Sequence, residues 1–563
     1  HNWKQDTSLT KRMREQVYFD VDELDLSRDA VSRKDVMGDR DVARGKVLAI
    51  MLAGVLDMLL SVQGWSAELT QPTPPEHHER VSLADAAVQA LQRNLDIRLS
   101  RRTMESRVAD IVIEQAKFDP TVSVNGRFNR TADPLNRPVF GATGNQLDQI
   151  MAFDQRTHSL TAEVSTTLLT GGNINLNYSP SRSSVNQDLA AGFLFNPAWT
   201  GGLTFTVTQP LLKNAGIPVN KTLITIAQNN AVVEQHVFRD QVLSVIATIE
   251  QHFWELVFAR DNVKVAQAAL KAAEELLATN RSKAEAGMRP VVDVLQAEAA
   301  VASRREQILV AEKAVRDEED QFRTLLNPGE AELRKNVRLT PIDPPLTSLE
   351  TLNPEEALET ALEQRPEMAQ AKKQMDSSKV NTQFARNQLL PTLSVQGTMG
   401  LSGLGNDYSS SFTRSFSGDF YNYGVGIVFS YPLGNRSAIS TYNKRQLEAE
   451  NAEVALERVR NKIILDVREA VRRVQTDFNR IETTRAARLL ADKQLQTEQE
   501  RLKVGLSTTR LVLEFQRDLA TAQGREVRAI VDYNKSLSNL ARQKATTLER
   551  YHIELSVGHD AVL

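Results

Sequence analysis

The sequence predicts an α+β membrane protein that is built from two copies of one unit: strand, strand, long helix, turn, long helix. Three observations lead to this fold class. Landmark residues recur along the chain at a constant offset, strand segments alternate between apolar and small polar residues, and helical segments run far beyond the length of a globular helix. Together they indicate sheets and paired rods rather than one compact core.

The N-terminal part, residues 1–67, predicts a targeting segment. Val47–Val62 is apolar except for Asp57, follows basic residues and leads to small ones, which is the layout of a secretory signal peptide. Residues 1–36 form a charged segment that a signal peptide does not need, which suggests that the true start is Met37. A single anchoring helix is the alternative, but it needs about 20 apolar residues. No other stretch resembles a transmembrane helix, so any membrane span is expected to be a β-barrel.

Composition argues against nucleic-acid binding and against most catalytic chemistry. The chain has 68 basic and 71 acidic residues among 563, so no positive surface is expected for DNA or RNA. It has no cysteine, which excludes disulfides and thiolate metal sites. The adjacent pair His77 and His78 lies in a Pro-rich linker expected over residues 68–80, where a surface pair is favoured over a metal site. Because no P-loop, zinc-binding motif, nucleophile elbow or dinucleotide fingerprint occurs, we predict no enzyme, catalytic residue, cofactor or metal.

The central part of the chain contains an internal repeat. Gln92–Gly126 and Glu363–Gly397 both pass from a helical segment through a polar stretch to a proline and then into an alternating strand, at an offset of 271 residues. Two repeats are therefore expected, over residues 81–350 and 351–555, followed by a tail over 556–563. Within them we expect strands near 120–210 and 391–431, and helical hairpins over 220–327 and 436–550.

Four segments alternate as strands with one apolar face. Small polar residues occupy most positions of the other face, as in a barrel wall between lipid and water. A strand of a soluble sandwich has the same local pattern, so the pattern alone leaves both open. The apolar positions are Val122, Val124 and Phe128; Leu203, Phe205 and Val207; Leu393, Val395 and Met399; and Tyr423, Val425, Ile427, Phe429 and Tyr431.

An extra hairpin is predicted between the first two strands. Alternation from Ala162 to Leu168 is followed by Gly171-Gly172 as a two-residue turn, and then by alternation back from Ile174 to Tyr178. Inserted into the wall, this hairpin would give six strands per chain rather than four. A hairpin in a loop is the alternative.

The helical segments are predicted to form two long antiparallel hairpins. Neither proline nor glycine occurs from Asn220 to Ala284, which allows roughly 100 Å of helix. After Gly287 and Gly505 the chain returns in a second helix. Apolar spacings of four and three indicate coiled-coil packing. They run through Val242, Ile246, Ile249, Phe253 and Leu256 in the first repeat, and Ile463, Val467, Ala470 and Val474 in the second.

Over residues 80–555 the sequence resembles the outer-membrane efflux (TolC-like) family. The resemblance implies a homotrimer in the cell outer membrane, in which strands pool into one transmembrane β-barrel and helices form a periplasmic α-helical coiled-coil barrel. Four to six strands cannot close alone, whereas three copies leave no exposed edge. The resemblance rests on the duplicated plan, the strand entries Phe118-Asp119-Pro120 and Leu390-Pro391, the strand exits Gln209-Pro210-Leu211 and Tyr431-Pro432-Leu433, and the hairpin-tip segment Ala286–Glu298.

The same resemblance implies a transport role. It predicts the outer-membrane exit channel of a tripartite efflux or type I secretion system, which passively conducts substrates. The implied partners are a periplasmic adaptor (membrane fusion protein), an inner-membrane pump of the RND, ABC or MFS type, and outer-membrane lipid. The alternative is a soluble or periplasmic coiled-coil scaffold, which would explain the helices but not the signal segment or the paired strands.

Residues at the two hairpin turns are the candidate site. In the family these tips face the pump and meet the adaptor. Each glycine is equally explained as the left-handed end of a helix. The matching positions are Gly287, Met288 and Arg289 in the first tip, and Gly505, Leu506 and Ser507 in the second.

Two acidic residues near the tips are gate candidates. Asp293 and Glu514 match positions that ring the constriction in the family, whereas Leu511 departs from the other acidic position of the second repeat. A threefold ring of carboxylates at a narrow water-filled mouth would favour cations. The alternative for Asp293 is that it complements the positive end of the helix dipole.

Aromatic residues cluster beside the last strand. Phe416, Phe420, Tyr421 and Tyr423 suit a membrane-interface girdle. Ordinary loop aromatics are the equally open alternative.

Overall fold

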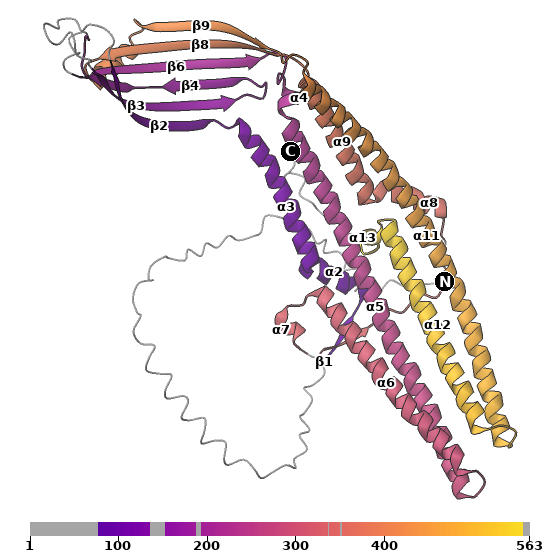
Figure 1. The fold of residues 1–563 in the computed structure, drawn as a ribbon. Helices are drawn as coiled ribbons and strands as arrows, with labels where there is room; N and C mark the ends of the chain where they lie inside the picture. Colours follow the sequence, from indigo (N-terminus) through magenta and orange to yellow (C-terminus); the bar gives the residue numbers. More distant parts are fainter. Residues whose placement is uncertain (1–76, 135–151, 187–192, 336, 350–351, 556–563) are drawn as a thin grey trace, which may run out of the picture.

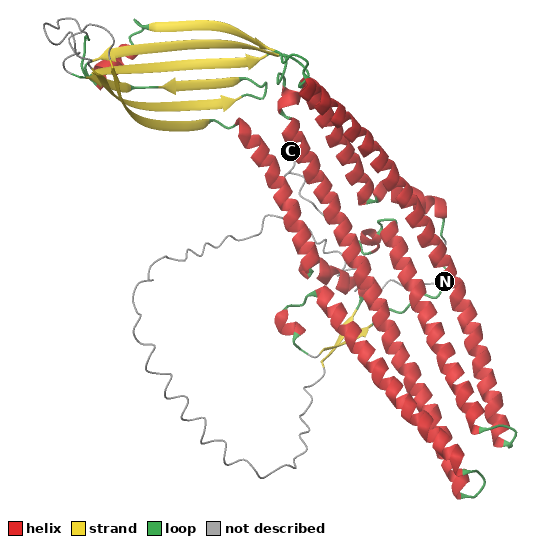
Figure 2. Ribbon diagram, viewed as in Figure 1, coloured by secondary structure: helices red, strands yellow, loops and turns green. Residues whose placement is uncertain are grey.

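The computed structural model describes residues 77–134, 152–186, 193–335, 337–349 and 352–555, which form an elongated molecule (Figure 1). A large sheet lies at one end, and long helices run away from it (Figure 2). The predicted signal segment Val47–Val62, the suggested start at Met37 and the tail over 556–563 lie outside the described residues.

All strands of the large sheet run antiparallel to their neighbours. β5 (Ser181–Val185) continues the path of β4 between the same two neighbours, β3 and β6. The ladder is interrupted between β4 and β5 because Pro180 lacks the N–H that a strand ladder needs. The predicted hairpin is therefore part of the sheet, which has six strand positions rather than four. Their order is β2 (Thr121–Pro134), β3 (Ala152–Thr167), β4 (Asn173–Tyr178), β6 (Ala198–Pro210), β8 (Thr392–Gly405) and β9 (Tyr421–Ser430).

The turn of the β3–β4 hairpin differs from the prediction. Residues 168–172 connect the two strands, so the two-residue turn at Gly171-Gly172 is wrong. Gly171 has a φ of 88°, and a Cβ there would come within 2.2 Å of the Asn214 carbonyl oxygen. The Gly216 N–H donates to Thr170 O at 3.0 Å. The turn is longer because it packs against the segment that leads into the first long helix.

Register across the sheet gives it one apolar face. Cα partners align in a continuous row through Val122, Val164, Leu176, Phe205, Met399 and Tyr423. Each of these side chains is at least 40% exposed in the single chain. The adjacent row, on the opposite face, runs through Ser123, Glu163, Asn177, Thr204, Gly400 and Asn422. The alternation predicted within each strand therefore extends across the whole sheet.

Two antiparallel helical hairpins extend from the sheet. The first joins α5 (Thr222–Glu285) to α6 (Val291–Leu326), and the second joins α11 (Arg436–Lys503) to α12 (Thr509–Gln543). α12 also packs along α5, which brings the hairpins together. All nine core positions predicted from helical spacing are at most 2% exposed. This prediction is confirmed.

The duplication is visible in the element boundaries. α2 (Leu83–Arg93), α3 (Leu95–Gln115) and β2 begin 271 residues before α8 (Pro354–Gln364), α9 (Pro366–Asn387) and β8. Ser82 and Asn353 each cap the helix that follows by accepting a backbone N–H. The offset shortens after β2 because, among the elements that the structure describes, the β3–β4 hairpin has no counterpart in the second repeat.

A small parallel sheet pairs β1 (His77–Val81) with β7 (Val337–Pro341). Residues 77–80 are predicted from the sequence as the end of a linker, but they form part of β1. The strand is held in place because Val81 and Leu339 of β7 pack in the core around α5. Short helical turns complete the fold: η1 (Ala116–Phe118), α4 (Ile217–Asn220), α7 (Glu330–Leu333), α10 (Tyr408–Ser415) and α13 (Thr547–Arg550).

α5 is apolar and long enough to cross a membrane, with a mean hydropathy of 1.2 over an 18-residue window. The expectation that no further stretch resembles a transmembrane helix is wrong in that respect. Because 61% of this window is buried inside the fold, the apolar side chains of α5 form part of the hydrophobic core between the helices.

Candidate functional site at the hairpin tips

Both hairpin tips are closed by the same backbone motif. The glycine N–H donates to the carbonyl three residues earlier, and the next N–H donates to the carbonyl five residues earlier, at 2.8 to 3.3 Å. Gly287 and Gly505 have φ values of 72° and 81°. This is a Schellman cap, which satisfies the last carbonyls of α5 and α11. The helix-end role of both glycines is therefore present in the structure.

The residue after each glycine projects from the tip. Met288 and Leu506 are each 70% exposed, and the neighbouring Val291 and Val504 are 68% and 70% exposed. Apolar side chains grouped on the outside of a turn are typical of a contact surface. We call these four side chains the apolar tips.

Arg289 turns inward and joins the two hairpins. Its guanidinium pairs with Asp293 Oδ2 of its own hairpin at 3.0 Å. It also donates to Thr509 Oγ1 and Leu502 O of the second hairpin, each at 3.3 Å. Only 13% of the Arg289 side chain is exposed. Hydrogen bonds from a charged donor in such a sheltered place are stronger than those of exposed pairs.

A buried amide supports this contact. Asn280 is 1% exposed, and its Nδ2 donates to Thr509 Oγ1 at 3.2 Å and to Asp293 O at 3.3 Å. Sequence reasoning missed both Asn280 and Thr509. A signal was present, because Asn280 follows the core residue Leu276 by one helical turn, and a polar residue at a core position needs a partner.

Ser507 occupies the place of Arg289 in the second tip, but it bonds within its own hairpin. Its hydroxyl donates to Glu498. That residue is 5% exposed, and its carboxylate also pairs with Arg501 at 3.2 Å. Equivalent positions of the two repeats therefore have different contacts. Arg289 of the first tip bonds to the second hairpin, whereas Ser507 of the second tip bonds within its own hairpin.

The two predicted gate carboxylates have different surroundings. Asp293 lies in the first turn of α6, and Arg289 neutralises its charge, so it is not a free carboxylate. Glu514 lies on α12 and is exposed; within the ranges that the structure describes, its side chain has no ion pair or hydrogen bond. Only Glu514 of the two therefore offers an uncompensated negative charge.

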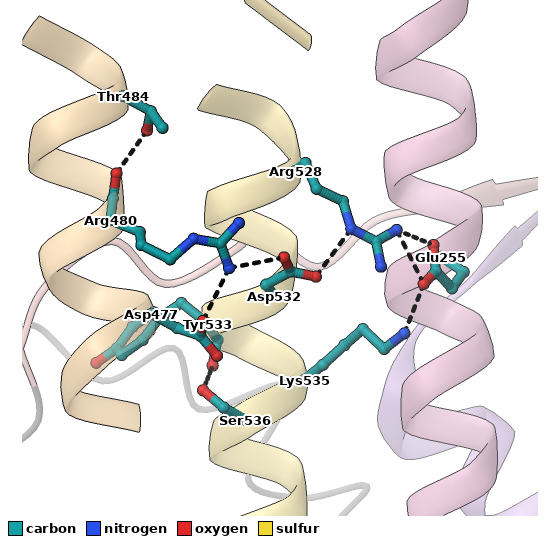
Figure 3. A network of polar contacts seen from close by, with 9 residues as sticks. All are labelled: Glu255, Asp477, Arg480, Thr484, Arg528, Asp532, Tyr533, Lys535 and Ser536. Carbon is teal, nitrogen blue, oxygen red and sulfur yellow. Dashed lines mark hydrogen bonds and ion pairs between the residues drawn. The ribbon is translucent and has the colours of Figure 1, made fainter. Parts of the chain in front are cut away.

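A second polar cluster connects the hairpins about halfway along α5 (Figure 3). Glu255 of α5 pairs with Arg528 at 2.9 Å and with Lys535 at 2.5 Å, both on α12. Asp532 of α12 pairs with Arg528 at 2.9 Å and with Arg480 of α11 at 3.1 Å. Burial raises the pKa of Glu255, but the hydrogen bond from Lys535 and the charge of Arg528 outweigh it, so the pKa lies below its ordinary value.

Comparison with known proteins identifies a family that this chain matches. A family model described as "Outer membrane efflux protein" matches residues 173–328 and 357–543. The pyoverdine export outer membrane protein OpmQ of Pseudomonas putida is 25% identical over 51% of this chain and 58% of its own length. The outer membrane protein TolC of Vibrio cholerae is 22% identical over 56% of this chain and 70% of its own.

Solved structures show the same fold. CusC, described as undergoing folding and transmembrane channel formation, superposes with a TM-score of 0.60 at 14% identity. The superposition covers 82% of this chain and 91% of CusC.

Proposed function

Because the chain belongs to the outer membrane efflux protein family, we propose that it is the exit channel of a tripartite efflux or type I secretion system. The protein resides in the outer membrane, and its helical part extends into the periplasm. Three copies form the channel. It conducts substrates passively after an inner-membrane pump has delivered them through a periplasmic adaptor.

The observation that carries this proposal is the one-sided sheet with two open edges. β2 and β9 end the strand order, and each pairs with one neighbour only among the described strands. Three sheets joined edge to edge would give a wall of about eighteen strands with no exposed edge. The apolar face then meets lipid and the polar face meets water.

The height of the apolar face suits a membrane. From Val207 to Trp199, the residues of β6 that point to this face are apolar or glycine. Eight residue steps cover about 27 Å along a strand, and a tilt of about 40° reduces this to about 21 Å, close to the height of about 25 Å of an outer-membrane barrel's apolar band. A soluble scaffold has no use for such a band.

The hairpin tips suit contact with the adaptor and closure of the channel. The apolar tips give the adaptor an exposed surface that costs little to desolvate. The Arg289 bonds to the second hairpin hold the tips of one chain together. A threefold ring of Glu514 carboxylates would add a cation-selective constriction.

The inner-membrane pump, rather than the exit channel, selects the substrate. Two relatives, the OpmQ proteins of two Pseudomonas species, are named for the export of pyoverdine. For this chain we propose small organic molecules as the first substrates to test, with a pump of the RND, ABC or MFS type.

Reconstitution tests the channel directly. The purified mature protein in detergent should have the mass of a trimer by native mass spectrometry, and it should give discrete conductance steps in planar bilayers. Cells that lack the gene should become sensitive to hydrophobic toxic compounds or lose one secreted product. A protein that stays soluble after lysis, monomeric and without conductance, would instead be the scaffold.

A further inference from the structure

We propose that three arginines at the far end of the sheet, Arg130, Arg156 and Arg182, bind the phosphate groups of outer-leaflet lipid headgroups. This inference rests on the proposed function, because it takes the apolar face of the sheet as the face toward lipid. The far end is the one away from the two long helical hairpins (Figure 1). With the helices in the periplasm, it lies at the outer leaflet.

Register places the three arginines on the apolar face. Arg130 of β2 lies opposite Arg156 of β3. Two residues further along β3, His158 lies opposite both Phe128 of β2 and Arg182 of β5. Because directly opposed residues, and residues two apart along a strand, project from the same side, all of them share the face of Val122 and Val124.

The arginines lie where the apolar band ends. From Val122 to Phe128 the outward positions of β2 are apolar or glycine, and the next outward residue is Arg130. On β5, Arg182 lies opposite Trp199 of β6. The Phe128 and His158 rings are 4.7 Å apart. Aromatic rings beside basic side chains are typical of the boundary between lipid tails and headgroups.

Helix α10 marks the same boundary independently. It lies on this face of β6 and β8, since a Cβ on Gly201 would come 2.7 Å from Ser415 Oγ, and one on Gly403 2.2 Å from Ser411 O. Glycine is needed at both places for α10 to approach this closely. Tyr408 of α10 packs on Trp199 with ring centroids 5.8 Å apart, and Phe412 packs on Tyr178 at 6.0 Å. Exposed aromatics therefore border the arginines.

The cluster has an excess of positive charge. Arg130 forms a two-pronged pair with Asp154, at 3.0 and 2.7 Å, and Arg156 is 3.9 Å from the same carboxylate. The Arg130 and Arg156 side chains are each 55% exposed. Among the described residues of this cluster, three guanidinium groups and one carboxylate leave a net positive charge. Guanidinium binds phosphate through parallel hydrogen bonds, and its long stem can lie on apolar surface while the charged end stays at the headgroups.

Titration of the purified trimer in detergent tests this inference. The probes are a diphosphorylated glycolipid of the lipid A type, the same lipid without its phosphates, and inorganic phosphate. Bound lipid is counted by native mass spectrometry. Wild-type protein should bind the phosphorylated lipid about tenfold more tightly than the other two, and the double variant Arg156→Gln, Arg182→Gln should lose this preference.

Matched variants distinguish a phosphate site from a general effect of positive charge. Arg127→Gln removes an exposed arginine from the opposite face of β2 and should leave lipid binding unchanged. Arg156→Lys with Arg182→Lys keeps the charge but loses the parallel hydrogen bonds, so its affinity for the phosphorylated lipid should lie between that of the wild type and that of the double glutamine variant. Equal binding by wild type and the double glutamine variant would overturn the inference, and so would equally tight binding of inorganic phosphate or equal loss in Arg127→Gln. The double glutamine variant should still conduct, so a failure of lipid binding is distinct from a failure of the channel proposal.

Discussion

The guanidinium of Arg289 and the hydroxyl of Thr509 lie 3.3 Å apart across the boundary between the two helical hairpins of one chain. The two residues are 220 positions apart in sequence and both are sheltered from solvent. Separation of the tips would break this contact and the parallel bond from Arg289 to Leu502. A substitution that removes these two hydrogen bonds therefore tests whether they hold the tips together.

Replacement of Arg289 should loosen the tips. Arg289→Ala removes hydrogen bonds with a charged donor, each contributing about 1.5–3 kcal/mol, and leaves the Asp293 carboxylate unpaired. Single-channel recordings should show a resting conductance several times that of the wild type. Arg281→Ala is the control, because Arg281 pairs with Glu298 inside the first hairpin and is 56% exposed. Equal conductance in the two variants would exclude the link as a closing device.

Neutralising Glu514 should weaken cation selectivity. In a trimer, Glu514→Gln removes three uncompensated charges from the narrow end, and the reversal potential in a potassium chloride gradient should move toward zero. Asp293→Asn changes the net charge by the same amount, because it leaves the positive charge of Arg289 unbalanced, so the reversal potential should again move toward zero. Glu306→Gln, which alters an exposed carboxylate along α6, serves as the control. A reversal potential unchanged by Glu514→Gln would remove this residue from the gate.

Two glycine substitutions should shift stability in opposite directions. Gly505→Ala places a Cβ on a residue with φ of 81°, which costs about 1 kcal/mol. Gly524→Ala, inside α12, should stabilise by about 0.5–1 kcal/mol, since Ala favours the helix. Its Cβ would meet Asn262 Oδ1 at 3.9 Å, an ordinary contact. Thermal unfolding midpoints compare the two; a lower midpoint for Gly524→Ala than for Gly505→Ala would contradict this account of the tips.

Glu255 should make stability depend on pH. Its pKa is lowered in the folded state from an ordinary value of about 4.5, so its contribution is present above that value and is lost as pH falls through the folded pKa. At neutral pH, Glu255→Gln should cost about 1 kcal/mol, and this difference from wild type should shrink in acid. Denaturant unfolding across that range measures it. Glu274→Gln, in an exposed pair with Arg305, should change little at any pH.

The apolar tips should matter for the adaptor rather than for stability. Met288→Asp with Leu506→Asp should abolish co-purification of the host cell's periplasmic adaptor, while the unfolding midpoint stays close to wild type, because both side chains are exposed. Val310→Asp is the control, since it changes a valine on α6 that is 63% exposed and lies away from the tips. Undiminished adaptor capture by the double variant would place the contact elsewhere.

Much of this architecture is predictable from short-range patterns. Helical spacing identifies core residues such as Phe253 and Val474, both 0% exposed, because burial repeats with the pitch of the helix. Alternation places Val122 and Phe205 on one face of their strands because successive side chains of a strand point to opposite faces. Both patterns depend on residues within one element, and packing does not alter them.

The site is less predictable because its contacts cross from one hairpin to the other. Gly287 and Gly505 are recognisable as turns in the sequence, but nothing near Arg289 indicates that its guanidinium reaches Leu502 and Thr509. The sequence position of Asp293 suggests a gate carboxylate, whereas the structure gives it a partner that cancels its charge.

The sequence by itself determined the duplicated plan, the faces of the strands, the cores of the long helices and the glycine turns. Each follows from local steric preference or from the period of an element. The tertiary structure decided that the β3–β4 hairpin enters the sheet, that α10 covers Gly201 and Gly403, and that Arg289 joins the tips. These outcomes depend on which distant surfaces meet, and that is settled by the packing of the whole chain.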